Sequence, residues 1–231
     1  MATNMNQKLA RRLSHLTEKS AIDKPTFKMV AKIHGKFVFG RRVMRLANGI
    51  ASLIPPGCKT VLDVGSGSGE VAAYLKELAP SLSMTGVDVL VREQTAIPTK
   101  SFDGVTLPFP NKSFDVVLLI DVIHHSQKPN ELLRDCARVA KRAVIIKDHL
   151  QKNRFDHYVL SVMDWAGNAS HGVQREDRYF SAQEWADLYQ KGSLNLIRTQ
   201  QRLDLYPFPF SLLIERHLHF MSLLQPQSAI D

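Results

Sequence analysis

Glycines and carboxylates follow short apolar runs in this chain, in a pattern that can hold a nucleotide. The stretch KTVLDVGSGSGEVAAYL, residues 59–75, places Gly65, Gly67 and Gly69 between an apolar run and a helical pattern. Glycines in such a corner let a ligand approach the backbone, because no side chains intrude. The dinucleotide fingerprint G-x-G-x-x-G is not met, since Glu70 stands at its third glycine position. The stretch predicts a nucleotide-binding corner and leaves the nucleotide open.

Further acidic and histidine residues lie where other predicted strands end. They are Asp88, Asp103, Asp121 with His124 and His125, and Asp148 with His149. In an open α/β sheet the ligand binds beyond the carboxyl ends of the strands. Asp88, at the end of MTGVDV, is placed to accept hydrogen bonds from ribose hydroxyls. This much suits either a nicotinamide cofactor or S-adenosylmethionine.

Four motifs between Val61 and about Asp148 decide between these two cofactors by resemblance. VLDVGSGSGE, GVDV, DGVTLPFPNKSFDVV and DVIHHSQKPNELLRDCARV resemble the successive motifs of class I S-adenosylmethionine-dependent methyltransferases. They are most similar to the ubiquinone/menaquinone-type branch (methyltransferase type 11-like). FVFGRR, IIKDH and MDWAGN are similar to phrases of uncharacterised small bacterial methyltransferases, so the substrate does not carry over.

The resemblance implies a cofactor site and a role for each of its residues. The methionine end of S-adenosylmethionine would lie against Asp63, Gly65, Gly67 and Gly69, and the ribose would bind Asp88. Asp103 would bind the adenine amine with Gly104 beside it, and Asp121 and Val122 would flank the sulfonium. Ser66 and Val89 are further expected cofactor-binding residues.

Methyl transfer from a sulfonium is an in-line displacement, so positioning of the acceptor can supply most of the catalysis. A base is needed only if a proton must leave. The candidate bases are His124, His125, Asp148, His149 and His171, of which His125 and His149 are the better pair if their strands are neighbours. Either histidine can equally be a packing residue. No metal is expected, because no ligand spacing such as H-x-x-x-H supports one.

Four residues are candidates for binding the acceptor: Phe37, Arg41, Trp165 and Tyr179. Phe37 and Arg41 belong to FVFGRR, which is equally consistent with an ordinary amphipathic helix packed on the sheet. Trp165 and Tyr179 belong to a predicted cap, where aromatic side chains can line an apolar acceptor pocket. They can also form the small core that holds such a cap together.

Alternation of apolar runs with helical patterns predicts the fold. Strands are expected at 60–64, 83–87, 114–120, 143–147, 194–203 and 212–220, and helices at 70–78, 129–140 and 181–190. This order predicts an α/β, Rossmann-like doubly wound, mostly parallel sheet. Only YPFPF separates the last two strands, which predicts an antiparallel C-terminal hairpin strand. Residues 1–58 are expected to form a basic helical arm or lid, and 59–231 the methyltransferase domain with a cap insertion at about 151–180.

Composition sets the protein class. Of 231 residues, 44% are hydrophobic and 23% charged, as in globular proteins, and the longest strongly apolar run, Val116 to Ile120, is too short to cross a membrane. Cys58 and Cys136 are in neither C-x-x-C nor metal-ligand spacing, which favours a reducing compartment, and no secretory pattern follows Met1. A cytoplasmic protein is therefore expected.

The net charge of +8 is concentrated at the N-terminus. Residues 1–60 hold twelve Lys/Arg against two acidic residues, whereas the remainder holds 18 basic and 20 acidic residues. Such an arm can attract an anionic partner, although a solvated helix face is the simpler explanation, because no aromatic residues accompany the early charges.

The sequence therefore predicts a methyltransferase that uses S-adenosylmethionine and acts on a small, ring-containing or lipid-like acceptor. An RNA methyltransferase that uses the basic arm, and a non-catalytic cofactor-binding partner protein, are alternatives. A nicotinamide dehydrogenase is the weakest alternative because of Glu70. The acceptor atom and the oligomeric state stay open.

Overall fold

A computed structural model describes residues 40–168, 178–208, 211 and 217–227 of this chain. The chain divides into two compact units, Met1–Gly40 and Arg41–Asp231, and the fold below is that of the second. Residues 1–39, about two thirds of the predicted basic arm and with them Phe37, lie outside the described residues, as does His171. The role predicted for the arm therefore stays a prediction.

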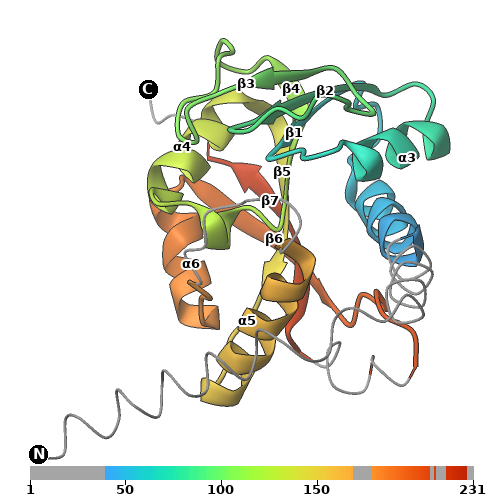
Figure 1. Ribbon diagram of the computed structural model, residues 1–231. Helices are drawn as coiled ribbons and strands as arrows, with labels where there is room; N and C mark the ends of the chain where they lie inside the picture. The colour runs from blue at the N-terminus through green and yellow to red at the C-terminus, as the bar shows by residue number, and fades with distance from the viewer. Residues whose placement is uncertain (1–39, 169–177, 209–210, 212–216, 228–231) are drawn as a thin grey trace, which may run out of the picture. The chain divides into compact units, whose positions relative to one another are not determined.

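A seven-stranded sheet forms the centre of the second unit (Figure 1). Its strands are β1 (Thr60–Val64), β2 (Ser83–Asp88), β3 (Thr99–Ser101), β4 (Phe114–Ile120), β5 (Ala140–His149), β6 (Leu194–Gln201) and β7 (His219–Pro226), in the order β3-β2-β1-β4-β5-β7-β6. The first five are parallel, and β7 runs antiparallel to both β5 and β6. The predicted fold class is confirmed.

Helices cover both faces of this sheet (Figure 1). They are a helix of residues 40–53, α3 (Glu70–Leu78), the 3-10 turn η1 (Ile123–His125), α4 (Pro129–Val139), α5 (Arg154–Asn168) and α6 (Ala182–Lys191). The helix of residues 40–53 and α3 share one buried cluster with Val116 and Leu118 of β4, and α4 and α6 share another with Val117 and Leu119. Alternate strand residues point to opposite faces, so both faces are apolar and both need a helical cover.

The last strand differs from the prediction. The sequence has two apolar runs near its end, 212–214 and 220–224, separated by the charged residues Glu215 and Arg216. Residues 212–216 of the predicted strand 212–220 lie outside the described residues, and residues 217–218 are a turn; the strand begins at His219, and β5 pairs with the second run, for example Ile145 with Leu223. The antiparallel pairing of the two final strands is confirmed, but residues 202–218 connect them, not a five-residue turn.

Two further elements were absent from the predicted set. Strand β3 has three residues, two of them exposed, so it carries no apolar signal and is held by pairing with β2. Helix α5 lies inside the predicted cap insertion.

The start of α6 agrees with the sequence, because Ser181 and Glu184 form the expected capping box. Residues 41–53 belong to the same compact unit as the sheet, since Leu46, Ile50 and Leu53 are buried in its core.

The topology places the chemistry-bearing residues at one edge of the sheet. The carboxyl ends of β1, β2, β4 and β5 meet there because these strands are parallel. The amino end of antiparallel β7 joins them, with His219 paired to His149.

Candidate functional site

The glycine loop between β1 and α3 has a backbone that only glycine adopts readily. Gly65, Gly67 and Gly69 have φ of +68°, +57° and +76°, in the left-handed region. A Cβ atom at Gly65 would lie 2.6 Å from Cγ2 of Val122, and one at Gly69 would lie 2.8 Å from Cγ1 of Ile97. The loop is therefore packed tightly against Val122, just after β4, and against Ile97.

Asp88 ties the end of β2 to this loop. Its Oδ2 accepts a hydrogen bond of 2.7 Å from the Gly67 amide, and its Oδ1 accepts one of 3.0 Å from the Leu90 amide. Ser66 packs on the same strand, because a Cβ at Gly86 would lie 2.6 Å from the Ser66 hydroxyl oxygen. Asp88 thus holds the loop in shape, a second role beside the predicted contact with the ribose.

Apolar side chains lie exposed next to Asp88. Val89 and Leu90 each expose 62% of their surface. Gly104 faces Val89, since a Cβ at Gly104 would lie 3.2 Å from Val89 Cγ1. Asp103 is exposed, and hydrogen bonds from the Thr106 and Val105 amides to its Oδ1 lower the pKa of its carboxyl. An apolar surface beside a carboxylate suits a flat, amine-bearing ring such as adenine.

Asp63 is a buried carboxyl at the end of β1, only 3% exposed. Burial and the negative charge of nearby Asp88 raise the pKa of Asp63 to about 7. The carboxyl is therefore half neutral near pH 7, and a cation bound beside it would ionise it.

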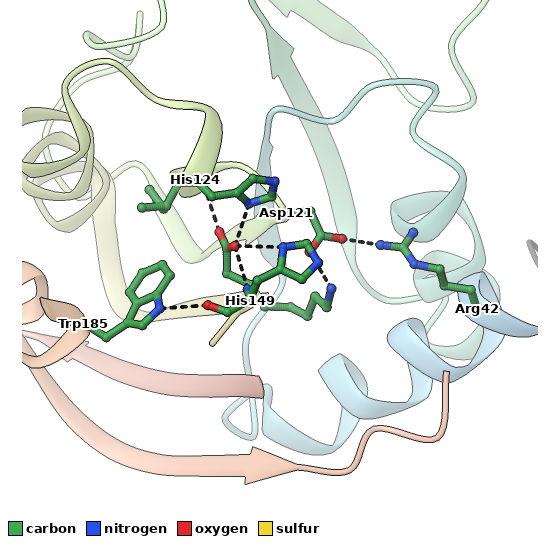
Figure 2. A network of polar contacts seen from close by, with 8 residues as sticks. Arg42, Asp121, His124, His149 and Trp185 are labelled. Atoms are coloured by element: carbon green, nitrogen blue, oxygen red, sulfur yellow. Dashed lines mark hydrogen bonds and ion pairs between the residues drawn. The ribbon is translucent and has the colours of Figure 1, made fainter. Parts of the chain in front are cut away.

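Asp121 occupies the point where β4 ends beside the glycine loop. Its φ of +56° is unusual for a residue other than glycine, and its amide donates to the Lys147 carbonyl at 2.8 Å. Its carboxylate forms ion pairs with Lys147 of β5 and with Arg42 of the helix of residues 40–53 (Figure 2). Burial opposes ionisation, but these two cations hold the pKa of Asp121 well below its usual range. Strained backbone at such a position is a mark of functional sites.

His149 lies between two carboxylates. Its Nε2 atom is 3.8 Å from Oδ1 of Asp121, and its Nδ1 atom is 3.6 Å from Oδ1 of Asp148. Its carbonyl accepts a hydrogen bond of 3.0 Å from the indole of Trp185 (Figure 2). Burial, together with the charge of Lys147, lowers the pKa of His149, so its imidazole is neutral at pH 7. A neutral imidazole between two carboxylates can take up a proton.

Asp148 orders the other side of the cluster. Its oxygens accept hydrogen bonds of 3.1 Å from the Ile123 amide, 2.7 Å from the His149 amide and 2.6 Å from Nδ1 of His124. The rings of His124 and His149 are 4.7 Å apart between centroids, whereas His125 packs against His124 at 3.9 Å and is half-buried. The structure thus brings His124 and His149 together, and places the predicted partner His125 one residue farther along η1.

The predicted acceptor-binding residues lie in different surroundings. Tyr179 is buried, with its ring 5.8 Å from that of His124 and 5.9 Å from that of His149. Arg41 points elsewhere, into an ion pair of 2.9 Å with Asp204. The side chain of Trp165 and the whole of Phe37 lie outside the described parts of the chain.

Two residues of the cluster, Lys147 and His219, were not selected from the sequence, whereas Arg42 belongs to FVFGRR, where Arg41 or Arg42 was considered for contact with a carboxylate or phosphate. His219 is 2% exposed, its ring lies 5.0 Å from that of His149, and neither ring nitrogen has a hydrogen-bond partner within the described residues. Lys147 had a signal, since a lysine inside the apolar run AVIIKDH is a buried charge that needs a partner. No sequence signal indicated His219, because the strand that begins at this residue was expected to begin at Leu212.

Ligand atoms of His124, Asp148 and His149 lie within 4.8 Å of one another, a grouping that can hold a metal ion. Two formal cations, Arg42 and Lys147, already balance the two buried carboxylates. A divalent ion would add uncompensated buried charge, which is strongly unfavourable. This balance favours the expectation of no metal, which stays a prediction.

A cavity of about 590 Å³ lies between α6 and strands β6 and β7, lined by side chains such as Trp185, Tyr189 and Phe220. None of the predicted cofactor residues lines it. We place the site at the carboxyl edge, where the carboxylates and the glycine loop converge, because the cavity lacks such groups.

Comparison with known proteins agrees with this geometry. Residues 62–146 match the family model described as a methyltransferase domain. A demethylmenaquinone methyltransferase of Thermotoga maritima is 29% identical over 52% of this chain and 60% of its own length. Residues 62–146 therefore carry a methyltransferase domain that is similar to those of class I S-adenosylmethionine-dependent enzymes. The resemblance to the ubiquinone/menaquinone type is thereby confirmed.

Other methyltransferases extend the comparison. A phthiotriol/phenolphthiotriol dimycocerosates methyltransferase of Mycobacterium tuberculosis is 31% identical over 44% of this chain and 41% of its own length. The chain thus spans less than two thirds of either curated relative. A solved structure of the complex between the Haloferax volcanii Trm112 methyltransferase activator and a putative methyltransferase contains a chain with the same fold, at a TM-score of 0.64 and 13% sequence identity. The match covers 91% of the present chain and 100% of the matched chain.

The cofactor of this methyltransferase domain is S-adenosylmethionine, and the site passes a test of fit. Asp63 is a buried carboxyl that a cationic amino group would ionise, and Val89 lies exposed near Asp103, where a flat ring could pack. The role of each individual residue in holding the cofactor stays a prediction. In the described part of the chain, no helix is both long enough and apolar enough to cross a membrane.

Proposed function

We propose that this protein is an enzyme that transfers the methyl group of S-adenosylmethionine to a small, ring-containing or lipid-like acceptor. One observation supports this most strongly: two consecutive residues at the end of β4 contact the glycine loop and the histidine cluster. Val122 packs against Gly65 of the loop, and the preceding residue, Asp121, lies within 3.8 Å of His149. A base and a methyl donor would therefore be neighbours.

The bound cofactor supplies an electrophilic methyl group on a sulfonium. In the proposed site His149 takes a proton from the acceptor, because it is neutral at pH 7 and buried. Asp121 and Asp148, on either side, stabilise the imidazolium that forms. The hydrogen bond from His124 holds Asp148 in place. Arg42 and Lys147 keep Asp121 ionised and add positive charge where an acceptor anion would form.

The aromatic Tyr179 supports a ring or a lipid chain as the acceptor, because it presents an apolar ring to both histidines. The relatives are named for methyl transfer to demethylmenaquinone and to phthiotriol dimycocerosates. Both names are consistent with an apolar acceptor, and neither identifies the acceptor of this chain.

The first test is calorimetric titration of the full chain with S-adenosylhomocysteine, in parallel with NADH. We expect micromolar binding of S-adenosylhomocysteine and no binding of NADH. Asp88→Ala removes the carboxylate that holds the Gly67 amide, and should weaken binding at least about tenfold, or 1.4 kcal/mol. Asp187→Ala, an equal substitution on the exposed face of α6, is the matched control and should bind normally. Tight NADH binding would reverse the proposal.

The second test is methyl transfer to a panel of phenols, quinols and hydroxylated lipids, read by product mass. A total lack of turnover alongside normal S-adenosylhomocysteine binding would support the non-catalytic partner protein. Methyl transfer to RNA, with an affinity that falls steeply with salt, would support the RNA methyltransferase that uses the basic arm.

A further inference from the structure

Helix α5 exposes two aromatic side chains on a fixed face. Phe155 and Tyr158 are each 67% exposed, and their i,i+3 spacing places them side by side on the helix surface. The opposite face is anchored, because Leu160 is fully buried in a cluster with Tyr179 and Leu218. The exposure of the two aromatic rings is therefore set by the packing of the helix.

Ion pairing fixes the same orientation. Asp156 is 3% exposed and accepts hydrogen bonds of 2.8 Å from the Lys152 amide and from Nε2 of His217. The carboxylate is thus turned inward. The exposed charged side chains between residues 151 and 161 are Lys152 and Arg154, both positive. Aromatic rings flanked by cations, with the neighbouring acid withdrawn, make a surface that complements an anionic interface.

This surface borders the proposed acceptor site. His157, on the turn between Phe155 and Tyr158, lies 5.4 Å from the ring of Tyr179. Tyr179 in turn lies 5.9 Å from His149. Helix α5 follows β5 directly beyond the carboxyl edge of the sheet (Figure 1). An acceptor held in a bilayer under α5 would be close to the histidine cluster.

We propose that Lys152, Arg154, Phe155 and Tyr158 of the chain dock on an anionic lipid surface, from which the enzyme takes a lipid-like acceptor. The proposal rests on the proposed function for its acceptor class. The aromatic side chains enter the headgroup boundary, and the two cations contact lipid phosphates. A contact with a second copy of the chain would use the same rings, and the test separates the two.

The test is co-sedimentation of the full chain, saturated with S-adenosylhomocysteine, with vesicles of phosphatidylcholine alone or mixed with phosphatidylglycerol. We expect binding to the mixed vesicles and much weaker binding to phosphatidylcholine. The double variant Phe155→Ser, Tyr158→Ser should lower binding to the mixed vesicles by about tenfold, because the inserted apolar area is lost. Lys152→Glu with Arg154→Glu should abolish the preference for the anionic lipid.

Ile197→Ser is the matched control, since Ile197 is 57% exposed on edge strand β6, and it should bind vesicles like the wild type. Vesicle binding that is unchanged in the α5 variants would overturn the proposal and assign the lipid contact to the basic N-terminal residues. A change of oligomer mass in the double variant, with lipid binding intact, would also overturn it in favour of self-association. S-adenosylhomocysteine affinity of the same variants reports on the proposed function separately and should be unchanged.

Discussion

The Nδ1 atom of His124 lies 2.6 Å from Oδ1 of Asp148, and both side chains are almost completely buried. This pair fixes the His124 ring with its Nδ1 atom towards the carboxylate. Burial opposes ionisation of Asp148, but His124 and His149 hold its pKa below the usual range. The carboxylate therefore joins η1 to the end of β5 and so sets the shape of the histidine cluster.

Asp148→Ala should destabilise the fold by about 3 kcal/mol, because the Ile123 and His149 amides and His124 lose a buried acceptor together. Asp148→Asn keeps one acceptor oxygen and should have a smaller effect. Urea unfolding measures both variants against the wild type. Equal stability of Asp148→Ala and the wild type would contradict this account of the cluster.

His149→Gln should lower methyl transfer by about 10² to 10⁴ if the acceptor loses a proton, with S-adenosylhomocysteine affinity unchanged. In the wild type, activity should fall in acid as His149 is protonated, at a pKa below the ordinary value because of burial and Lys147. That acid limb should vanish in His149→Gln. His125→Gln is the control, and an effect there as large as at His149 would move the base to His125.

Most of the strands and the glycine loop were predictable because their signals are local. Continuous apolar runs, the glycine corner and the Ser181 capping box each depend on neighbours in sequence. The position of strand β7 and the role of His219 were not predictable. Pairing with β5 selects one of two apolar runs as the strand, and that contact is long-range. Likewise, nothing in the tandem His124–His125 indicates which ring faces Asp148; the turn of η1 decides it.

Binding of S-adenosylhomocysteine should release a proton from Asp63 near neutral pH. The pKa of this carboxyl is raised to about 7 by burial and by Asp88, and a bound ammonium group would lower it. Affinity should therefore increase as pH rises from about 6 to 8. Calorimetry at pH 7 in two buffers of different ionisation enthalpy counts the protons. Asp63→Asn should bind without this proton release, and an identical release in that variant would assign the proton to another group.

Gly65→Ala should abolish cofactor binding and destabilise the fold by about 1–3 kcal/mol, since the new Cβ would lie 2.6 Å from Val122 at a φ of +68°. Val122→Ala in the same chain should recover part of the stability, because it removes the clash and not the backbone strain. Gly40→Ala is the control: this helical residue has open space around its Cβ position, and the variant should be as stable as the wild type or slightly more stable. Thermal unfolding and calorimetry read both effects.

His219→Phe separates a structural histidine from a functional one. Burial and the charge of Lys147 hold the pKa of His219 well below its ordinary value, so the unfolded chain binds its proton first as pH falls. The free energy of unfolding should then decrease below about pH 6.5, by up to about 1.4 kcal/mol per pH unit for this group. His219→Phe keeps a planar aromatic ring, slightly larger than imidazole, and removes two ring nitrogens that have no partner in the described residues, so it should be more stable than the wild type and less sensitive to acid. Asp63 contributes a slope of opposite sign to the pH dependence of stability between about pH 4 and 7, and the comparison of variant with wild type cancels it.

If His219 binds the acceptor, the more stable variant should also turn over more slowly, with a raised KM. A gain in stability with full activity would assign His219 to packing alone, and a loss of stability would contradict the expected gain from removing unpartnered ring nitrogens.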